Sequence, residues 1–167
     1  MIQMRIKSAV AVLLVHVSMS AICLAQESTL AWRTLIPLKS TRSEVEKILG
    51  KPDQTFDSYA LYRNGDGLFS VWYSLGGCGH KIEGLQWNVP KGLMTSLFVR
   101  VNETMPMTKY ISNIDDYRRE EMPYDRILYV SPNEGLIFET IKSKDRDKLV
   151  YSVTLDPTKE QDKLRCK

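Results

Sequence analysis

The sequence is poor in the residues that most often carry catalytic or metal chemistry, with two histidines and three cysteines among 167 residues. It contains no H-E-x-x-H, C-x-x-C or G-x-S-x-G motif, the spacings of zinc proteases, thiol redox centres and serine hydrolases. If the leader described below is removed, His80 is the only histidine left. A histidine-rich zinc site is thereby excluded, and we expect neither a metal ion nor another cofactor.

The sequence also lacks a large excess of charge of one sign, because 23 Lys and Arg residues stand against 20 Asp and Glu residues. Arg5 and Lys7 lie in an N-terminal segment without acids, so the remainder carries 21 basic and 20 acidic residues. Nucleic acids and anionic membranes bind clustered basic side chains. We therefore expect no nucleic-acid partner and no attraction to an anionic membrane surface.

The N-terminal segment has the order of a secretory signal peptide. A charged start at residues 1–7 precedes an apolar run at residues 9–15, and Cys23-Leu24-Ala25 supplies small residues before the expected cleavage site. A histidine and two serines interrupt the segment before it reaches the ~20 apolar residues of a transmembrane helix. We predict a signal peptide at residues 1–25, no transmembrane span after its cleavage, and a periplasmic or extracellular location. Lipidation at Cys23 and an uncleaved anchor are the alternatives.

Removal of the leader leaves two cysteines, Cys78 and Cys166. An even pair in an oxidising compartment predicts a disulfide between them, which would hold the polar C-terminal residues 158–167 in place. The alternative is a catalytic Cys78 thiolate with His80 as its base. Residues two apart in a glycine-rich turn have no fixed geometry, which favours the disulfide.

Residues 41–44, Thr-Arg-Ser-Glu, have the spacing of a helix capping box. Val45, Ile48 and Leu49 follow at helical spacing, and Gly50 supplies a stop signal. The pattern predicts a helix of about two turns whose apolar side packs on a sheet.

The remaining pattern predicts an antiparallel meander. Asn64-Gly65-Asp66-Gly67 is a strong hairpin signal, and Ile114 to Glu121 forms a polar, helix-compatible segment that ends before Pro123. Runs of apolar and strand-forming residues mark six strands, at residues 55–62, 68–74, 94–101, 127–130, 136–141 and 149–155.

These elements predict one exported α+β domain at residues 26–167, with an antiparallel meander sheet of about six strands and two short helices. The order helix, strand, strand, strand occurs twice, in residues 35–101 and 112–155. The two halves suggest a duplication, although chance similarity between two meanders explains the order equally well.

A group of aromatic side chains surrounds the first hairpin and the loop after it. Tyrosine and tryptophan are frequent anchors of protein interfaces, yet such side chains on a sheet also pack in a core. The possible binding face consists of Tyr59, Tyr62, Trp72, Tyr73 and Trp87.

Paired carboxylates occur at Asp115-Asp116 and Glu120-Glu121. Such pairs can perform acid and base catalysis when a cleft raises one pKa. Here they flank Arg118 and Arg119, so ion pairing in solvent is the expected role.

Residues 40–52, Ser-Thr-Arg-Ser-Glu-Val-Glu-Lys-Ile-Leu-Gly-Lys-Pro, resemble the start of small exported bacterial modules of the SmpA/BamE-like type and of the related β-lactamase-inhibitor-protein-like domains. The resemblance implies a short helix packed on a small antiparallel sheet and a place in the cell envelope. The chain as a whole resembles uncharacterised exported bacterial proteins, and that resemblance implies no activity.

The function expected from these patterns is an exported, non-catalytic binding or envelope-associated module. Its partner would be another envelope protein or a small ligand. The alternative is a small secreted hydrolase that uses Cys78 and His80, or the carboxylates between Asp115 and Glu121.

Overall fold

The computed structural model describes residues 30–79, 86–142 and 149–167. The chain divides into two compact units, residues 1–31 and 32–167. Of the first unit, only Leu30 and Ala31 are among the described residues. The predicted signal peptide at residues 1–25, Cys23 and His80 lie outside the described residues. Within the described ranges, no helix has the length and apolar character needed to cross a membrane.

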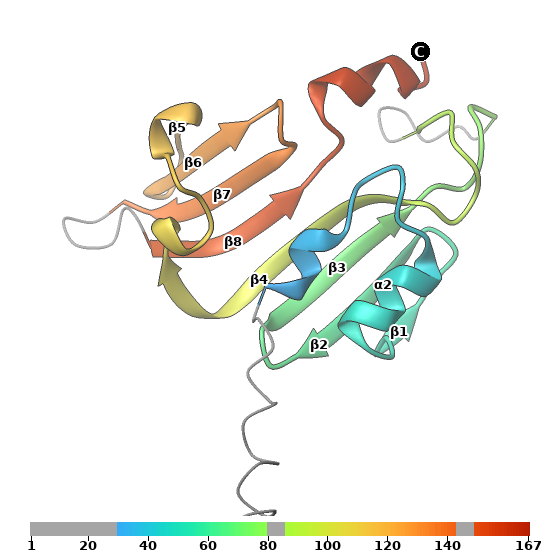
Figure 1. Ribbon diagram of the computed structural model, residues 1–167, viewed down its shortest axis with the longest axis horizontal. Coiled ribbons are helices and arrows are strands. Elements are labelled where there is room, and N and C mark those ends of the chain that lie inside the picture. Colours follow the sequence, from blue (N-terminus) through green and yellow to red (C-terminus); the bar gives the residue numbers. More distant parts are fainter. Residues whose placement is uncertain (1–29, 80–85, 143–148) are drawn as a thin grey trace, which may run out of the picture. The chain divides into compact units, whose positions relative to one another are not determined.

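The second unit is built on one antiparallel sheet in the order β1-β2-β3-β4-β8-β7-β6-β5 (Figure 1). Strands β1 to β4 form one meander and β5 to β8 form another, and the pairing of β4 with β8 joins the two. The strands are β1 (Gln54–Thr55), β2 (Tyr59–Asn64), β3 (Gly67–Tyr73), β4 (Met94–Pro106), β5 (Arg118–Met122), β6 (Arg126–Ser131), β7 (Leu136–Ile141) and β8 (Leu149–Leu155).

Helix α2 (Arg42–Leu49) forms where the capping box predicts it. The backbone N–H of Thr41 donates to Glu44 Oε2 at 2.7 Å, and the Glu44 N–H donates to Thr41 Oγ1 at 3.3 Å. Gly50 has a φ of 88° and ends the helix, a conformation that costs glycine little. Val45 and Leu49 are buried, so the apolar side of the helix packs into the core.

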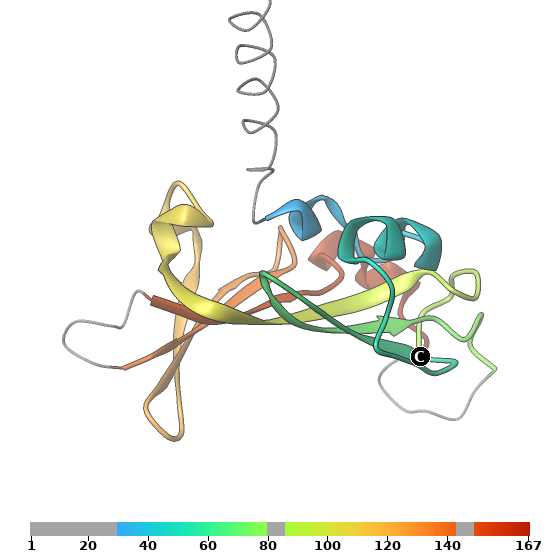
Figure 2. The ribbon, with the colours of Figure 1, turned by 90° about the horizontal axis from the view of Figure 1, so that it is seen from below.

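The two faces of the sheet differ in their cover. Figure 2 shows α2 and the 3-10 turn η1 (Ala31–Thr34) on one face. Every second residue of β3, from Gly67 to Tyr73, is buried on that face, while the residues between them are partly or fully exposed. The alternation follows from the two-residue period of a strand. Among the described residues, the second face carries no α-helix.

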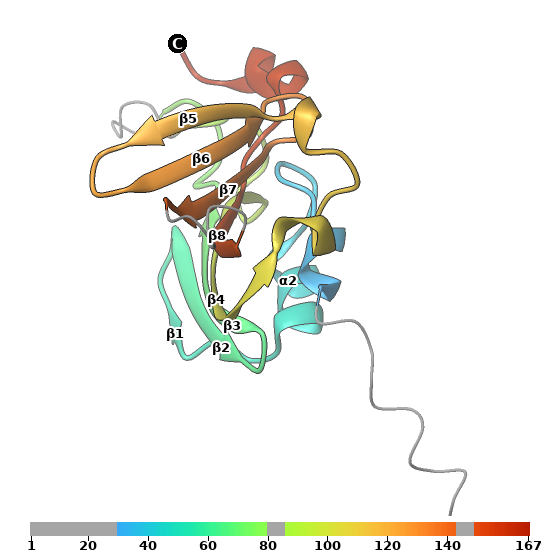
Figure 3. The same cartoon turned by 90° about the vertical axis from the view of Figure 1, so that its left-hand side faces the viewer.

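The sheet twists strongly along its width. Figure 3 shows β5 and β6 running across the direction of β1 and β2, as the right-handed twist of successive strands requires. The second face is therefore curved rather than flat where the two meanders meet.

The predicted α+β class with about six strands and two short helices is wrong. The sheet has eight strands, and α2 is the one α-helix in the described part of the chain. The remaining helical segments are short 3-10 turns. They are η1, η2 (Met107–Lys109), η3 (Ile114–Asp116) and η4 (Lys159–Leu164).

The second predicted helix, Ile114 to Glu121, accounts for much of the difference between the predicted and the observed fold. Only Ile114–Asp116 is helical, as the 3-10 turn η3, and the backbone is extended again at Tyr117 with φ −112° and ψ 129°. Arg118–Met122 then forms β5, paired with β6 through Glu120 opposite Leu128. Pairing with a strong strand overrides a weak local helix preference.

The two predicted halves are consequently not a helix followed by three strands each. Both contain four strands of the sheet, and their hairpins β2–β3 and β6–β7 occupy corresponding places in the strand order. A duplication stays a prediction.

Candidate ligand-binding groove

A groove of about 760 Å³ lies on the face of the sheet that α2 does not cover. Its floor is one row of neighbouring side chains across four strands. Phe98 on β4 pairs with Thr154 on β8, Thr154 pairs with Ile137 on β7, and Ile137 pairs with Val130 on β6. Trp72 on β3 borders the row, and its side chain is 39% exposed. The floor is thus mainly aromatic and aliphatic.

The C-terminal segment forms an end wall of the groove. Residues of η4, which follows β8 (Figure 1), line it together with Gln86 and Trp87. The N–H of Asn88 donates to the Leu164 carbonyl at 2.7 Å, and the N–H of Cys166 donates to the Gln86 carbonyl at 2.9 Å. These two bonds hold the segment in a fixed position.

The predicted disulfide between Cys78 and Cys166 is confirmed. It joins the wall segment to the loop after β3, across a sequence separation of 88 residues. Beside it, the Arg165 guanidinium lies 4.5 Å from the centre of the Trp87 ring. The sulfur of Cys78 is therefore bonded to Cys166, and the wall is tied covalently to the rest of the site.

Asp156 is the carboxylate at the end of the floor. Ser96 Oγ donates to its Oδ1 at 2.6 Å, and its backbone N–H donates to the Gly135 carbonyl at 2.7 Å. A Cβ at Gly135 would lie 2.0 Å from the Asp156 carbonyl oxygen, and Gly135 has a φ of 67°. Only glycine fits both conditions, so Gly135 allows the close approach that positions Asp156.

The charged residues that line the groove balance, with two of each sign. Lys159 and Arg165 are positive, and Asp156 and Asp162 are negative. Arg165 Nε lies 3.0 Å from Asp162 Oδ1, so these two compensate each other. The described lining residues therefore carry no net charge of either sign.

The five predicted aromatic residues do not share one face. Tyr62 and Tyr73 are buried beneath α2, with their hydroxyls 2.8 Å apart. Burial and the hydrogen bond with Tyr62 raise the pKa of Tyr73, and the Arg42 guanidinium lies 4.2 Å from the Tyr73 ring centre. This cluster belongs to the core that fixes α2 to the sheet.

Tyr59 and Trp72 lie on the groove side, directly opposite each other on β2 and β3. Phe56, which the sequence did not single out, stacks on Tyr59 with ring centres 4.3 Å apart. Trp87 lines the groove but is buried. Trp72 is therefore the one predicted residue that offers the groove a large exposed ring.

Sequence reasoning also missed Phe98, Ser96 and Asp156 as groove residues. The alternation of residues 94–101 did place Phe98 on the face opposite Leu97, Val99 and Val101, which was a usable signal. Nothing local pointed to Asp156, because its neighbour Ser96 comes from β4 through the β4–β8 pairing.

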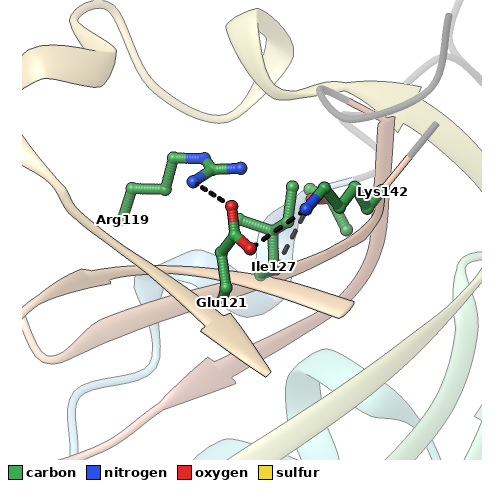
Figure 4. Close-up of polar contacts among 5 residues, drawn as sticks. Arg119, Glu121, Ile127 and Lys142 are labelled. Carbon is green, nitrogen blue, oxygen red and sulfur yellow. Dashed lines mark hydrogen bonds and ion pairs between the residues drawn. The ribbon is translucent and has the colours of Figure 1, made fainter. Parts of the chain in front are cut away.

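Asp115, Asp116, Glu120 and Glu121 all lie outside the groove, and Glu120 and Glu121 are ion-paired; Figure 4 shows the pairs of Glu121. Glu121 accepts hydrogen bonds from Lys142 Nζ at 3.0 Å and from Arg119 at 2.9 Å, and these bonds lower its pKa. Arg118 Nε donates to Glu120 at 2.6 Å. The figure shows the carboxylate of Glu121 between Arg119 and Lys142. A carboxylate with a lowered pKa stays ionised and does not serve as a general acid near neutral pH.

In the residues that the structure describes, no group of three or more His, Cys, Asp or Glu side chains could hold a metal ion.

No known protein family model matches the chain, and no curated protein matches it. Among solved structures it is similar to a cysteine-rich secretory protein from Staphylococcus aureus subsp. aureus Mu50. The identity is 9% and the TM-score 0.33, over 77% of this chain and 50% of that one. This chain thus spans half the length of that structure, and a likeness of this extent carries no argument about fold or function.

Proposed function

We propose that this chain is an exported, non-catalytic binding protein of the cell envelope or the medium, and that the groove holds its ligand. The single observation that carries the proposal is the groove itself. Its volume of about 760 Å³ falls within the ~300–1,000 Å³ typical of ligand sites, which are largely apolar with a few placed polar groups. Here Trp72 and Phe98 supply apolar surface, and Ser96 and Asp156 are the placed polar groups.

Export is supported by two features of different kinds. The order of residues 1–25 is typical of a signal peptide, and a disulfide such as Cys78–Cys166 forms and persists in oxidising compartments. The resemblance of residues 40–52 to SmpA/BamE-like modules also implies a place in the cell envelope. Mass spectrometry of the exported protein tests this directly, because cleavage after Ala25 gives a chain that begins at Gln26.

Two observations favour binding over the hydrolase alternative. The Cys78 sulfur is consumed by the disulfide, whereas a catalytic cysteine needs a free thiolate. Glu120 and Glu121 lie outside the groove and are paired with Arg118, Arg119 and Lys142. The pairing lowers the pKa of Glu121, whereas a general acid needs a raised one.

Two substitutions on β3 test the role of the groove. Trp72 lines the groove. Leu68 lies on the same strand and the same face and is equally exposed, at 39%, but it does not line the groove. We expect Trp72→Ala to abolish the recovery of ligands from envelope extracts and Leu68→Ala to leave it unchanged. Both variants should melt within a few degrees of the native protein.

Equal recovery of the same ligands by the native protein and Trp72→Ala would refute the groove as the binding site. A cooperative loss of fold in Trp72→Ala would prevent that comparison, so Trp72→Phe, which keeps an aromatic ring, accompanies it. Recovery that follows ring size, from Trp through Phe to Ala, supports stacking on this residue.

A further inference from the structure

The groove has a chemistry that narrows the class of its ligand, and this inference rests on the proposed function above. Three properties of the described residues bear on the choice. They are the balance of charge, the use of the backbone groups of the floor, and the donors and acceptors that remain available.

The balance of charge disfavours a strongly charged ligand. Of the four charged lining residues, Arg165 and Asp162 form an ion pair with each other at 3.0 Å. Lys159 and Asp156 remain, one of each sign. An anion or a cation would gain attraction from one of them and repulsion from the other, whereas sites for charged ligands cluster one sign.

The floor cannot accept a peptide as an added strand. Phe98, Thr154, Ile137 and Val130 lie on β4, β8, β7 and β6, each of which already pairs with a neighbour on both sides. Strand addition needs the free backbone groups of a sheet edge. Recognition in this groove must therefore occur through side chains.

The side chains that remain combine flat rings with hydroxyls and one carboxylate. Trp72 and Phe98 offer ring surface, and Ser58, Ser96 and Thr154 are half-buried hydroxyls. Asp156 accepts one hydrogen bond, from Ser96 Oγ, and belongs to none of the ion pairs described above. An ionised carboxylate can only accept, so a ligand that covers Asp156 has to bring O–H or N–H donors to offset the loss of water.

These requirements distinguish between two uncharged ligands that can stack on aromatic rings, a proline-rich peptide and a sugar. A proline-rich peptide stacks on aromatic rings but has no backbone N–H at its prolines. Such prolines would cover Asp156 without supplying a donor to replace water, and only the bond from Ser96 Oγ would remain. A sugar has C–H surfaces that pack on rings and many hydroxyls that both donate and accept. We infer that the groove binds an uncharged oligosaccharide, stacked on Trp72 and hydrogen-bonded to Asp156.

The test is isothermal titration of the full chain, expressed for export, with a defined set of probes. Two uncharged tetrasaccharides are used, chitotetraose and cellotetraose, with the fully deacetylated cationic form of the first and an anionic tetragalacturonate as charged counterparts. Decaproline represents the peptide class. We expect at least one uncharged tetrasaccharide to bind, and neither charged oligomer to bind more tightly than it.

The variants locate that binding in the groove. Trp72→Ala should weaken it at least tenfold, and Asp156→Asn, which replaces a charged acceptor by a group of the same shape, should weaken it several-fold. Leu68→Ala should change it less than twofold. Thermal melting of each variant shows that it is folded, and the Trp72→Phe variant should bind with intermediate affinity.

Each other outcome overturns the inference in a different way. Tighter binding of either charged oligomer contradicts a neutral ligand. Binding of decaproline with Trp72 dependence, and of neither sugar, contradicts the ligand class and leaves the groove as the binding site. Binding of no probe also contradicts the sugar assignment. In that case the capture experiment with Trp72→Ala and Leu68→Ala decides separately whether the proposed binding function fails as well.

Discussion

Removal of the Cys78–Cys166 disulfide should destabilise the protein by several kcal/mol. In the chain-entropy model, cross-linking residues 88 positions apart restricts the unfolded chain by about 4.6 kcal/mol at 25 °C. We expect a variant with Cys78→Ala and Cys166→Ala to lose about 3 to 5 kcal/mol of unfolding free energy. Guanidinium unfolding of both proteins under the same conditions measures the difference.

The loss should fall at the lower end of this range if the C-terminal segment frays without the bond, because the folded state then regains some entropy as well. The hydrogen bonds from Asn88 to Leu164 and from Cys166 to Gln86 oppose such fraying. Amide exchange at Asn88 detects it, since that N–H is protected only while the segment is docked. A stability loss below about 1 kcal/mol, with Asn88 still protected, would refute the entropic reasoning.

Three further predictions concern single side chains. Thr41→Ala should lower the free energy of unfolding by about 1 kcal/mol, because it removes the side chain that caps α2. Ser43 is exposed in the same helix, so Ser43→Ala should cost almost nothing. Equal effects of the two substitutions in urea unfolding would contradict the capping role. Burial, followed by the hydrogen bond to Glu134, raises the pKa of Tyr117 above its unfolded value, so its contribution to stability is complete below about pH 10 and is lost as pH rises toward the folded pKa. Tyr117→Phe should therefore flatten the fall of stability above about pH 10, and an unchanged slope in a pH series of unfolding curves would disprove this. Glu121→Gln should leave the melting temperature nearly unchanged, because both of its ion pairs are exposed; a large drop in a melting scan would assign that network a structural role.

Local signals in the sequence were sufficient where short-range chemistry decides the structure. The Thr41–Glu44 capping box and Gly50 define α2 within one short segment. The turn at Asn64–Gly67 joins β2 to β3 as predicted. The disulfide was predicted by counting cysteines, since only Cys78 and Cys166 lie outside the predicted leader.

Local signals could not decide between helix and strand for the segment Ile114 to Glu121. Its two arginines and two glutamates can form ion pairs on a helix or, as Arg118–Glu120 and Arg119–Glu121 do, between second neighbours along a strand. The choice depends on β6, whose residues Ile127 and Tyr129 are buried and supply the partner strand. That information is not local to the segment.

The aromatic group illustrates a signal that was present and not used. Trp72 and Tyr73 are adjacent on one strand, and Tyr59 and Tyr62 are three apart on the next. The two-residue period of a strand places the members of each pair on opposite faces. Alternation alone thus excludes a common surface for all five residues, whereas the groove itself depends on the register between β4 and β8, which no short window of sequence contains.

The junction between β4 and β8 has a consequence for how the protein assembles. All other pairings of the sheet join strands that follow one another along the chain, but this one brings Leu97 beside Leu155. Closing so long a loop is entropically costly, and it is therefore expected to come late in folding. Because Phe98 and Thr154 face each other across this junction, the groove does not exist until the two meanders have met. A ligand that occupies it would hold them together and add its binding free energy to the last step of folding.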